Sequence, residues 1–271
     1  MIHKLFPYLC KNYVSMEYKN RIADKLLRDK LEAMGAVLIE GPKACGKTTT
    51  AEQQAKSIIY MDDPVKQEQY KQMAQTNIRF LLEGETPRLI DEWQHVPQFW
   101  DAIRFEVDHR DDDGQFMLTG SAVPADMKEI HHTGTGRYGW LTMRPMSLWE
   151  SGESTGEVSL SDLFLTPDRI GALNKLTLPM LAFAACRGGW PKSLQKKTEK
   201  AALSQVTEYY KAITNSDISR VDNVKRDEER AKRIMRSYAR HQGSQASIAT
   251  ILADISVSYT HLRAHETAAN L

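Results

Sequence analysis

One stretch of this chain constrains its fold more than any other, because it matches the phosphate-binding pattern G-x-x-x-x-G-K-[ST] in full. The apolar run 36–40 lies directly before it, and the run 49–56 contains neither glycine nor proline. This order predicts a buried strand, a tight loop and a helix, which is the context that the pattern needs. The matching residues are Gly41, Pro42, Lys43, Ala44, Cys45, Gly46, Lys47 and Thr48.

The residue types of this loop suit an anion. Gly41 and Gly46 allow a tight backbone turn that points several N–H groups inward. Lys47 is expected to reach the β- and γ-phosphates of a nucleotide, and the Thr48 hydroxyl is expected to ligate Mg²⁺. We therefore expect every residue of the loop, together with Thr49, to contact the nucleotide.

A second motif follows one strand–helix unit later. The short strand-like run 88–90, with apolar Leu89 and Ile90, stops at two acids, Asp91 and Glu92. Alone, such a pair is most often a solvated turn, but its position after a phosphate loop gives it another meaning. One carboxylate would hold Mg²⁺ and the other would activate the attacking water. We assign Asp91 to the metal ion and Glu92 to the general base.

Alternating strand and helix signals predict an α/β fold with a parallel sheet wrapped by helices. The strand 115–121 should end beside the phosphate loop, because ligands of such sheets lie at the carboxyl ends of strands. Ser121, with Thr119 as the fallback, is predicted to sense the γ-phosphate or the attacking water. Arg137 in the following Gly-rich loop is either an arginine finger or the partner of a structural carboxylate.

Charge and composition narrow the classes of partner. The formal net charge of +1 gives no bulk attraction to nucleic acid or to a membrane. Residues 187–240 nevertheless hold fourteen Lys and Arg against seven Asp and Glu. This excess indicates a surface for DNA or a protein partner, or else a solvated helical face. Three cysteines without metal-like spacing and no apolar run of bilayer length predict a cytoplasmic protein that binds no membrane.

Six segments carry a family resemblance, and they are 38–50, 89–94, 120–121, 136–137, 143–148 and 187–191. Together they resemble a group of prokaryotic AAA-type ATPases. Members of that group usually carry a winged-helix segment and a restriction-endonuclease-like C-terminal domain after the ATPase. The resemblance implies a P-loop core of three αβα layers, an α-helical lid, and ATP with Mg²⁺ as ligands.

Carried over by position, the resemblance puts Lys47 and Thr48 on phosphate and Mg²⁺. It assigns Asp91 and Glu92 to the second acidic motif and a sensor to the neighbourhood of Ser121. The candidate catalytic residues are Glu92, Lys47, Ser121 and Arg137.

Both ends of the chain are expected to lie outside the fold. A helical pattern starts only after Met16, and 257–267 resembles, residue for residue, one reading frame of a transposase-type sequencing adapter. A chain truncated within its winged-helix segment follows from that interpretation. The expected division is 1–15 upstream extension, 16–150 ATPase core, 151–242 helical lid and linker, 243–256 start of the winged helix, and 257–271 adapter-derived tail.

The residues leave three functions open. The first is Mg²⁺-dependent ATP hydrolysis coupled to conformational change on an unknown partner, in a chain that could form a homo-oligomer. The second is a non-hydrolysing, nucleotide-gated module that binds DNA or serves as a scaffold. The third is phosphoryl transfer to a small acceptor, since P-loop folds also make kinases.

Overall fold

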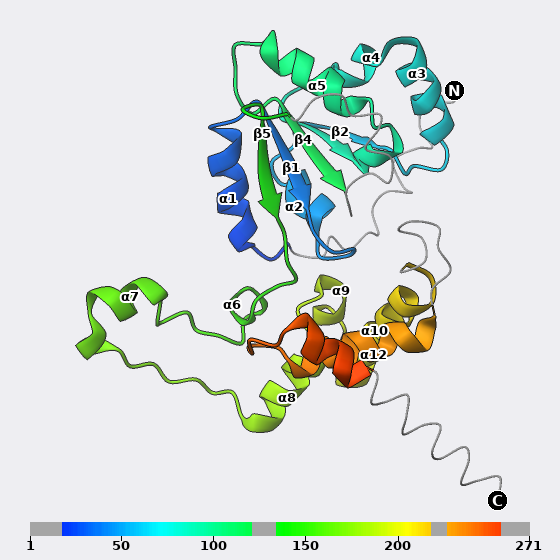
Figure 1. Ribbon diagram of the computed structural model, residues 1–271. Helices are drawn as coiled ribbons and strands as arrows, with labels where there is room; N and C mark the ends of the chain where they lie inside the picture. Colours follow the sequence, from blue (N-terminus) through cyan, green and yellow to red (C-terminus); the bar gives the residue numbers. More distant parts are fainter. Residues whose placement is uncertain (1–17, 121–133, 218–226, 256–271) are drawn as a thin grey trace, which may run out of the picture. The chain divides into compact units, whose positions relative to one another are not determined.

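A five-stranded parallel sheet forms the centre of the fold (Figure 1). The computed structural model describes residues 18–120, 134–217 and 227–255. The strands lie in the order β2-β3-β4-β1-β5, and all four pairings are parallel. The expected α/β fold with a parallel sheet is confirmed. The strands are β1 (Ala36–Glu40), β2 (Ser57–Tyr60), β3 (Arg88–Asp91), β4 (Phe116–Gly120) and β5 (Tyr138–Thr142).

The helices differ from expectation at two places. The run 65–82 contains neither glycine nor proline and therefore predicts one helix. It forms two, because the Asn77 side chain accepts a hydrogen bond from the Arg79 amide between them. The run 192–213, for which the sequence also predicts one helix, forms two, since the Thr198 side chain caps the start of the second. The helices are α1 (Ile22–Leu31), α2 (Lys47–Glu52), α3 (Gln67–Asn77), α4 (Arg79–Leu82), α5 (Phe99–Asp108), α6 (Leu148–Ser151), α7 (Leu160–Leu165), α8 (Leu178–Arg187), α9 (Pro191–Leu194), α10 (Glu199–Ala212) and α12 (Glu228–Arg240), with 3₁₀ turns at Trp93–His95 and Pro167–Arg169 and a π-helix at Ile213–Asp217.

Helices cover both faces of the sheet, because successive side chains of a strand point to opposite sides. On one face, Leu38 and Leu118 belong to the buried cluster that contains Phe99 of α5. On the other face, Ile39 packs in the cluster that contains Leu27 of α1. The three-layer αβα arrangement expected for the core is therefore present.

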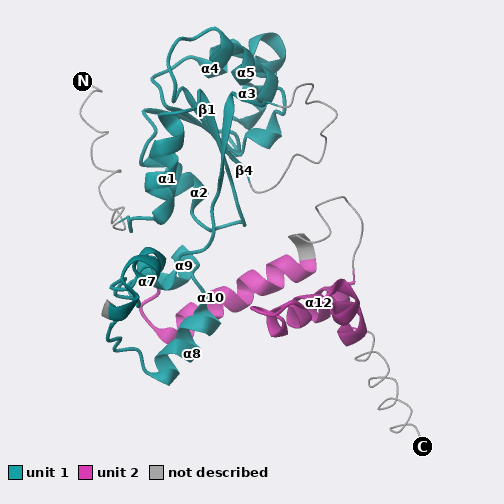
Figure 2. Cartoon of the chain, turned by 60° about the vertical axis from the view of Figure 1, so that its left-hand side comes forward, with its two compact units in different colours: residues 1–195 teal, residues 196–271 magenta. Residues whose placement is uncertain are grey.

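The chain divides into two compact units, residues 1–195 and 196–271 (Figure 2). The first unit contains the sheet and α1 to α9, and the second contains α10 and α12. The expected boundaries at residues 150, 242 and 256 concern function, and they stay predictions. Compactness and function need not divide a chain at the same residue.

The order of the strands decides which loops meet. β4 lies between β1 and β3, and Thr119 of β4 pairs in register with Ile39 on one side and Asp91 on the other. Since the strands are parallel, the loops that follow β1, β3 and β4 all leave the same edge of the sheet. The prediction that β4 ends beside the phosphate loop is confirmed.

The buried centre of β4 gives a test of this sheet. Leu118 is fully buried, whereas Leu160 of α7 is 71% exposed. Leu118→Ala is expected to lower the free energy of unfolding by about 2–5 kcal/mol, because it leaves a cavity between two layers. Leu160→Ala, the matched control, should change it by less than about 0.5 kcal/mol. Urea unfolding measures both, and equal losses would contradict the packing described.

Candidate functional site

The backbone of the phosphate loop passes through conformations that favour glycine. Gly41 has a φ of 150° and Gly46 a φ of 103°. A Cβ atom on Gly41 would lie 2.3 Å from the Met143 carbonyl oxygen, so a larger residue would force the two segments apart. Ala44 adopts a left-handed φ of 62°, which costs an ordinary residue roughly 1–2 kcal/mol. The chain accepts this cost to hold the tight turn that directs its amides toward an anion.

The Lys47 side chain folds back over the loop that precedes it. Its Nζ donates to the carbonyl oxygens of Gly41 at 2.9 Å and Pro42 at 3.1 Å, and the residue is only 6% exposed. Both acceptors are neutral, so neither contact compensates the positive charge. A negatively charged group beside the loop would gain from that charge.

The Asp91 carboxylate joins the phosphate loop to the central strands. Asp91 ends β3 and is 4% exposed, and its Oδ1 accepts a hydrogen bond from Thr48 Oγ1 at 2.7 Å. The same oxygen accepts a hydrogen bond from Thr119 Oγ1 of β4. Thr48 and Asp91 thus bring hard oxygen donors together, and such donors suit Mg²⁺. Within the described residues, no group of three or more His, Cys, Asp or Glu side chains gathers as a metal site.

Glu92 differs from its neighbour Asp91 in conformation and in surroundings. Its backbone is left-handed, with φ 54° and ψ 46°, and its side chain lines the pocket described below. Its Oε2 accepts a hydrogen bond from Gln94 Nε2, while Gln94 Oε1 is buried without a partner among the residues that the structure describes. Strained residues of this kind cost about 1–3 kcal/mol and occur mostly at functional sites.

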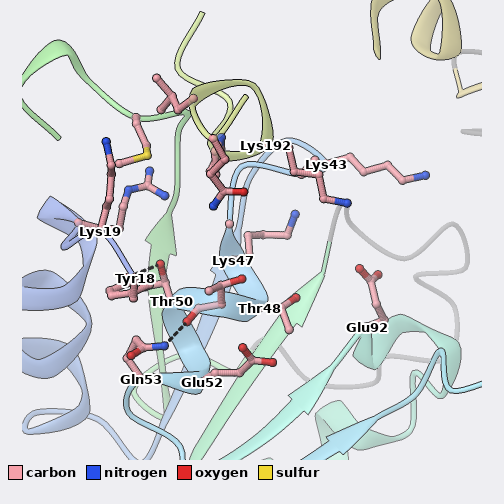
Figure 3. Close-up of a pocket in the computed structure, with 18 residues that line it drawn as sticks. Tyr18, Lys19, Lys43, Lys47, Thr48, Thr50, Glu52, Gln53, Glu92 and Lys192 are labelled. Carbon is pink, nitrogen blue, oxygen red and sulfur yellow. Dashed lines mark hydrogen bonds between the residues drawn. The ribbon is translucent and has the colours of Figure 1, made fainter. Parts of the chain in front are cut away.

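A pocket of about 760 Å³ opens beside the phosphate loop (Figure 3). Figure 3 shows Lys47, Thr48 and Glu92 around it. The remaining walls come from the segment before α1, from the α2 residues Thr50 and Glu52 with Gln53, from Met146, and from Pro191, Lys192, Leu194 and Gln195. This volume lies within the usual range for small-molecule sites. The expected nucleotide contacts that line the pocket are Lys43, Ala44, Gly46, Lys47, Thr48 and Thr49.

Three other residues of the phosphate loop, Gly41, Pro42 and Cys45, do not line the pocket. The carbonyl groups of Gly41 and Pro42 hold the Lys47 ammonium. The Cys45 side chain is fully buried in the cluster between the sheet and α1, and burial raises the pKa of its thiol. Cys45 therefore contributes backbone and packing to the site.

The other two expected catalytic residues are Ser121 and Arg137. Ser121 falls outside the described residues, and its fallback Thr119 is 1% exposed and donates to Asp91. Arg137 pairs with Asp108 of α5, with Nε 2.8 Å from Oδ1, and this hydrogen bond lowers the pKa of the Asp108 carboxyl. The structure thus shows a carboxylate partner for Arg137, while its role as an arginine finger stays a prediction.

Arg21, just before α1, forms hydrogen bonds with the phosphate loop and with the segment after β5. The sequence patterns did not indicate this role. Its Nη1 donates to the Cys45 carbonyl oxygen at 2.9 Å and its Nη2 to that of Arg144 at 2.7 Å. Its Nε donates to Glu150 Oε1 at 3.0 Å, and both side chains of this pair are 5% exposed. Since Glu150 lies 129 residues further along the chain, no local pattern could have revealed the pair.

Glu150 is held in its charged form. Burial alone would raise the pKa of its carboxyl, but hydrogen bonds from the amides of Ser147 and Ile22 and from Arg21 outweigh this effect and hold the pKa below its ordinary value. The Ser147 hydroxyl also completes a capping box with Glu150 at the start of α6. The ionised carboxylate therefore ties the starts of α1 and α6 to Arg21.

Comparison with known families finds two matches along the chain. Residues 34–151 match a family model described as "AAA domain". Residues 179–267 match one described as "Domain of unknown function (DUF8612)", and this match overlaps the segment expected to be adapter-derived. The first match includes the phosphate loop and the acidic pair, and it supports a P-loop domain of AAA type there. No curated protein gives a significant match.

Three of the solved structures that resemble this chain are distant in sequence. The Walker-type ATPase PABY2304 of Pyrococcus abyssi is 12% identical, with a TM-score of 0.45 and coverage of 88% of each chain. PCH-2 of C. elegans is 14% identical, with a TM-score of 0.36 over 70% of this chain and 66% of that one. The Aeropyrum pernix ORC1 protein in complex with DNA is 14% identical, with a TM-score of 0.35 over 92% and 79%. At these TM-scores, the interpretation of the site rests on this chain's own geometry.

Helix length and polarity give one further finding. Across residues 18–120, 134–217 and 227–255, none of the helices is long and apolar enough to cross a bilayer.

The lowered pKa of Glu150 predicts a pH dependence of stability. A carboxyl whose pKa is lower in the folded chain stabilises the fold fully above its ordinary pKa of 4.5, and this stabilisation is lost as the pH falls through the folded value. The unfolding free energy of the wild type should therefore fall more steeply than that of Glu150→Gln between about pH 6 and about pH 3.

Urea titrations at each pH measure that difference. Glu68→Gln is the matched control, because Glu68 is 76% exposed in a surface pair with Lys71. Its curve should run parallel to that of the wild type. Parallel curves for the wild type and Glu150→Gln would contradict the role given to the Glu150 carboxylate.

Proposed function

We propose that this chain binds ATP with Mg²⁺ and hydrolyses the β–γ phosphoanhydride bond. The hydrogen bond between Thr48 and Asp91, beside Lys47 and a separately held Glu92, is the observation that carries the proposal. This hydrogen bond joins the phosphate loop, which follows β1, to the acidic pair at the end of β3. The AAA-type family match over 34–151 supports the same activity.

In this proposal the phosphates lie on the amides of the phosphate loop. Lys47 exchanges its two carbonyl acceptors for oxygens of the β- and γ-phosphates, and this charged contact is stronger than the neutral ones it replaces. Thr48 and Asp91 would hold Mg²⁺, which neutralises charge on the phosphates when bound. The base and ribose then face the apolar side of the pocket, toward Met146 and Leu194.

Glu92 is the proposed general base. Its carboxylate accepts a proton from water while the water oxygen attacks the γ-phosphorus, and the bond from that phosphorus to the β–γ bridging oxygen breaks. ADP and phosphate are the products. Gln94 holds the carboxylate from one side, which limits the orientations that Glu92 samples. Catalysis thus consists mainly of positioning and electrostatic stabilisation.

The use of the ATP energy is proposed more broadly. We also propose that hydrolysis is coupled to conformational change on a partner and that the chain could form a homo-oligomer. The cysteine pattern supports a cytoplasmic location. DNA or a protein partner would bind through residues 187–240. Several basic side chains of that region form ion pairs with acidic side chains, and these pairs favour a protein partner over a nucleic-acid backbone. The pairs are Arg187 with Glu153, Lys211 with Glu208, Lys232 with Glu228 and Glu229, and Arg240 with Asp254.

Substitutions at the two charged groups should separate binding from hydrolysis. Lys47→Ala is expected to weaken ATP binding at least about tenfold, because a charged hydrogen-bond donor to phosphate is lost. Glu92→Gln should leave the Kd for ATP within about twofold and lower kcat roughly 100- to 10,000-fold, the usual contribution of a general base. Calorimetric titration with Mg·ATP and a phosphate-release assay measure the two effects.

Exposed residues of the same types serve as controls. Lys56→Ala and Glu68→Gln lie outside the pocket and should match the wild type in both assays. Hydrolysis by Glu92→Gln at the wild-type rate would exclude Glu92 as the base.

Phosphate release also distinguishes hydrolysis from a nucleotide-gated switch. We expect turnover by the wild type without DNA, because Thr48, Asp91 and Glu92 all come from the same compact unit. If DNA bound to 187–240 contributes to the cycle, its addition should change kcat in a salt-dependent way. Tight ATP binding without phosphate release, in the presence or absence of DNA, would favour the switch instead.

A further inference from the structure

Part of the pocket wall comes from segments that follow β5, outside the phosphate loop. This portion, called the far wall here, consists of Met146, Pro191, Lys192, Leu194 and Gln195. Its two parts meet at a backbone contact, where the Met146 amide donates to the Gly189 carbonyl oxygen at 2.7 Å. A Cβ atom on Gly189 would lie 1.9 Å from the Met146 carbonyl oxygen. Only glycine allows this close approach, and the hydrogen bond that it permits holds the segments 144–150 and 188–195 together.

Arg21 connects this wall to the phosphate loop. One Nη atom of Arg21 bonds the Cys45 carbonyl group of the loop, and the other bonds the Arg144 carbonyl group, two residues before Met146. Glu150 fixes the same guanidinium from the end of that segment. The guanidinium thus has one partner on the phosphate-binding side and two on the side that carries the far wall.

Gly46 of the phosphate loop lies between these two sides. A Cβ atom at this position would be 3.1 Å from Arg21 Nη1 and 3.6 Å from Pro191 Cγ. Trp190, the residue before Pro191, packs against the buried cluster that includes Cys45. The phosphate loop and the far wall therefore approach each other at Gly46, next to the Arg21 guanidinium.

We propose that the buried Arg21–Glu150 pair is a positioning device that holds the far wall against the phosphate loop and thereby sets the affinity for the whole nucleotide. The inference rests on the proposed function, since it concerns the same site. It adds that residues remote from the phosphates in sequence, and absent from the phosphate-binding motifs, determine how well the base and ribose are held.

Energetics favour a positioning role over a purely stabilising one. A buried ion pair loses solvation that its attraction only partly returns, so apolar packing in place of the whole pair would often give similar stability, although loss of one partner leaves an uncompensated buried charge. A guanidinium, however, projects fixed donors in several directions, and here each direction meets a different segment. Lysine keeps the charge but has no such planar fork. Arg21→Lys therefore separates geometry from charge.

A double-mutant cycle on the full chain tests the proposal, with Mg·ATP affinity measured by titration calorimetry. The variants are Arg21→Lys, Leu194→Ala and the double variant. Arg21→Lys should weaken binding about tenfold, within the usual range of coupling between sites. Leu194→Ala removes wall contact directly. Both substitutions act through the same wall. The Kd of the double variant for Mg·ATP should therefore be at most about twice that of the more weakly binding single variant, well below the Kd expected if the two losses multiplied.

Two further variants keep the test decisive. Glu150→Gln attacks the same pair from the other side and should reproduce the Arg21→Lys loss if the lysine variant folds poorly. Arg28→Lys, at an exposed position of α1, is the matched control and should bind as the wild type does. Thermal unfolding of each variant identifies losses that come from unfolding alone.

The outcomes distinguish the inference from the function on which it rests. Unchanged affinity in Arg21→Lys, or losses that multiply in the double variant, would overturn the positioning role while leaving ATP binding intact. The proposed function would instead be refuted if the wild type bound no ATP, or if the Lys47→Ala variant bound ATP as tightly as the wild type.

Discussion

The rest of the site depends on one hydrogen bond, from the Thr48 hydroxyl to the Asp91 carboxylate. It links a loop and a strand end that lie 43 residues apart in the chain. It can form because β4 separates β1 from β3 and contributes Thr119, whose hydroxyl bonds the same carboxylate oxygen. A buried carboxylate with two hydroxyl donors is satisfied without an ion, and it stays in place to receive one.

The two acids show how position alone separates chemical roles. Asp91 ends the strand and is oriented by the neighbouring hydroxyl groups. Glu92 begins a left-handed turn, which directs its side chain to the pocket and within reach of the Gln94 amide. Adjacent residues of a strand point to opposite sides, but a turn releases the second residue from that rule. In the proposed mechanism, the left-handed backbone at Glu92 thus separates the general base from the acid that would hold the metal ion.

Sequence patterns were sufficient for the phosphate loop, β1 and the acidic pair, because glycine spacing and apolar runs act over a few residues. They were insufficient for Arg21, whose partners Arg144 and Glu150 are more than a hundred residues away. They also joined α3 to α4, since the Asn77 side chain competes for a backbone amide without changing the apolar period. Arg137 remained ambiguous from sequence because an exposed arginine has many possible partners, and the fold supplies Asp108.

The sequence by itself determined the residue types on which the proposed chemistry rests: a glycine-rich loop, a lysine and a threonine expected to contact phosphate and metal, and two acids after a buried strand. These follow from residue types and short spacings, which local sterics and hydrogen bonding decide. Only the tertiary structure decided which groups meet. The strand order places Thr119 beside Asp91, and the buried Arg21–Glu150 pair joins segments that lie 129 residues apart in the chain. Such contacts depend on how layers pack, and packing is a property of the whole sheet rather than of any segment.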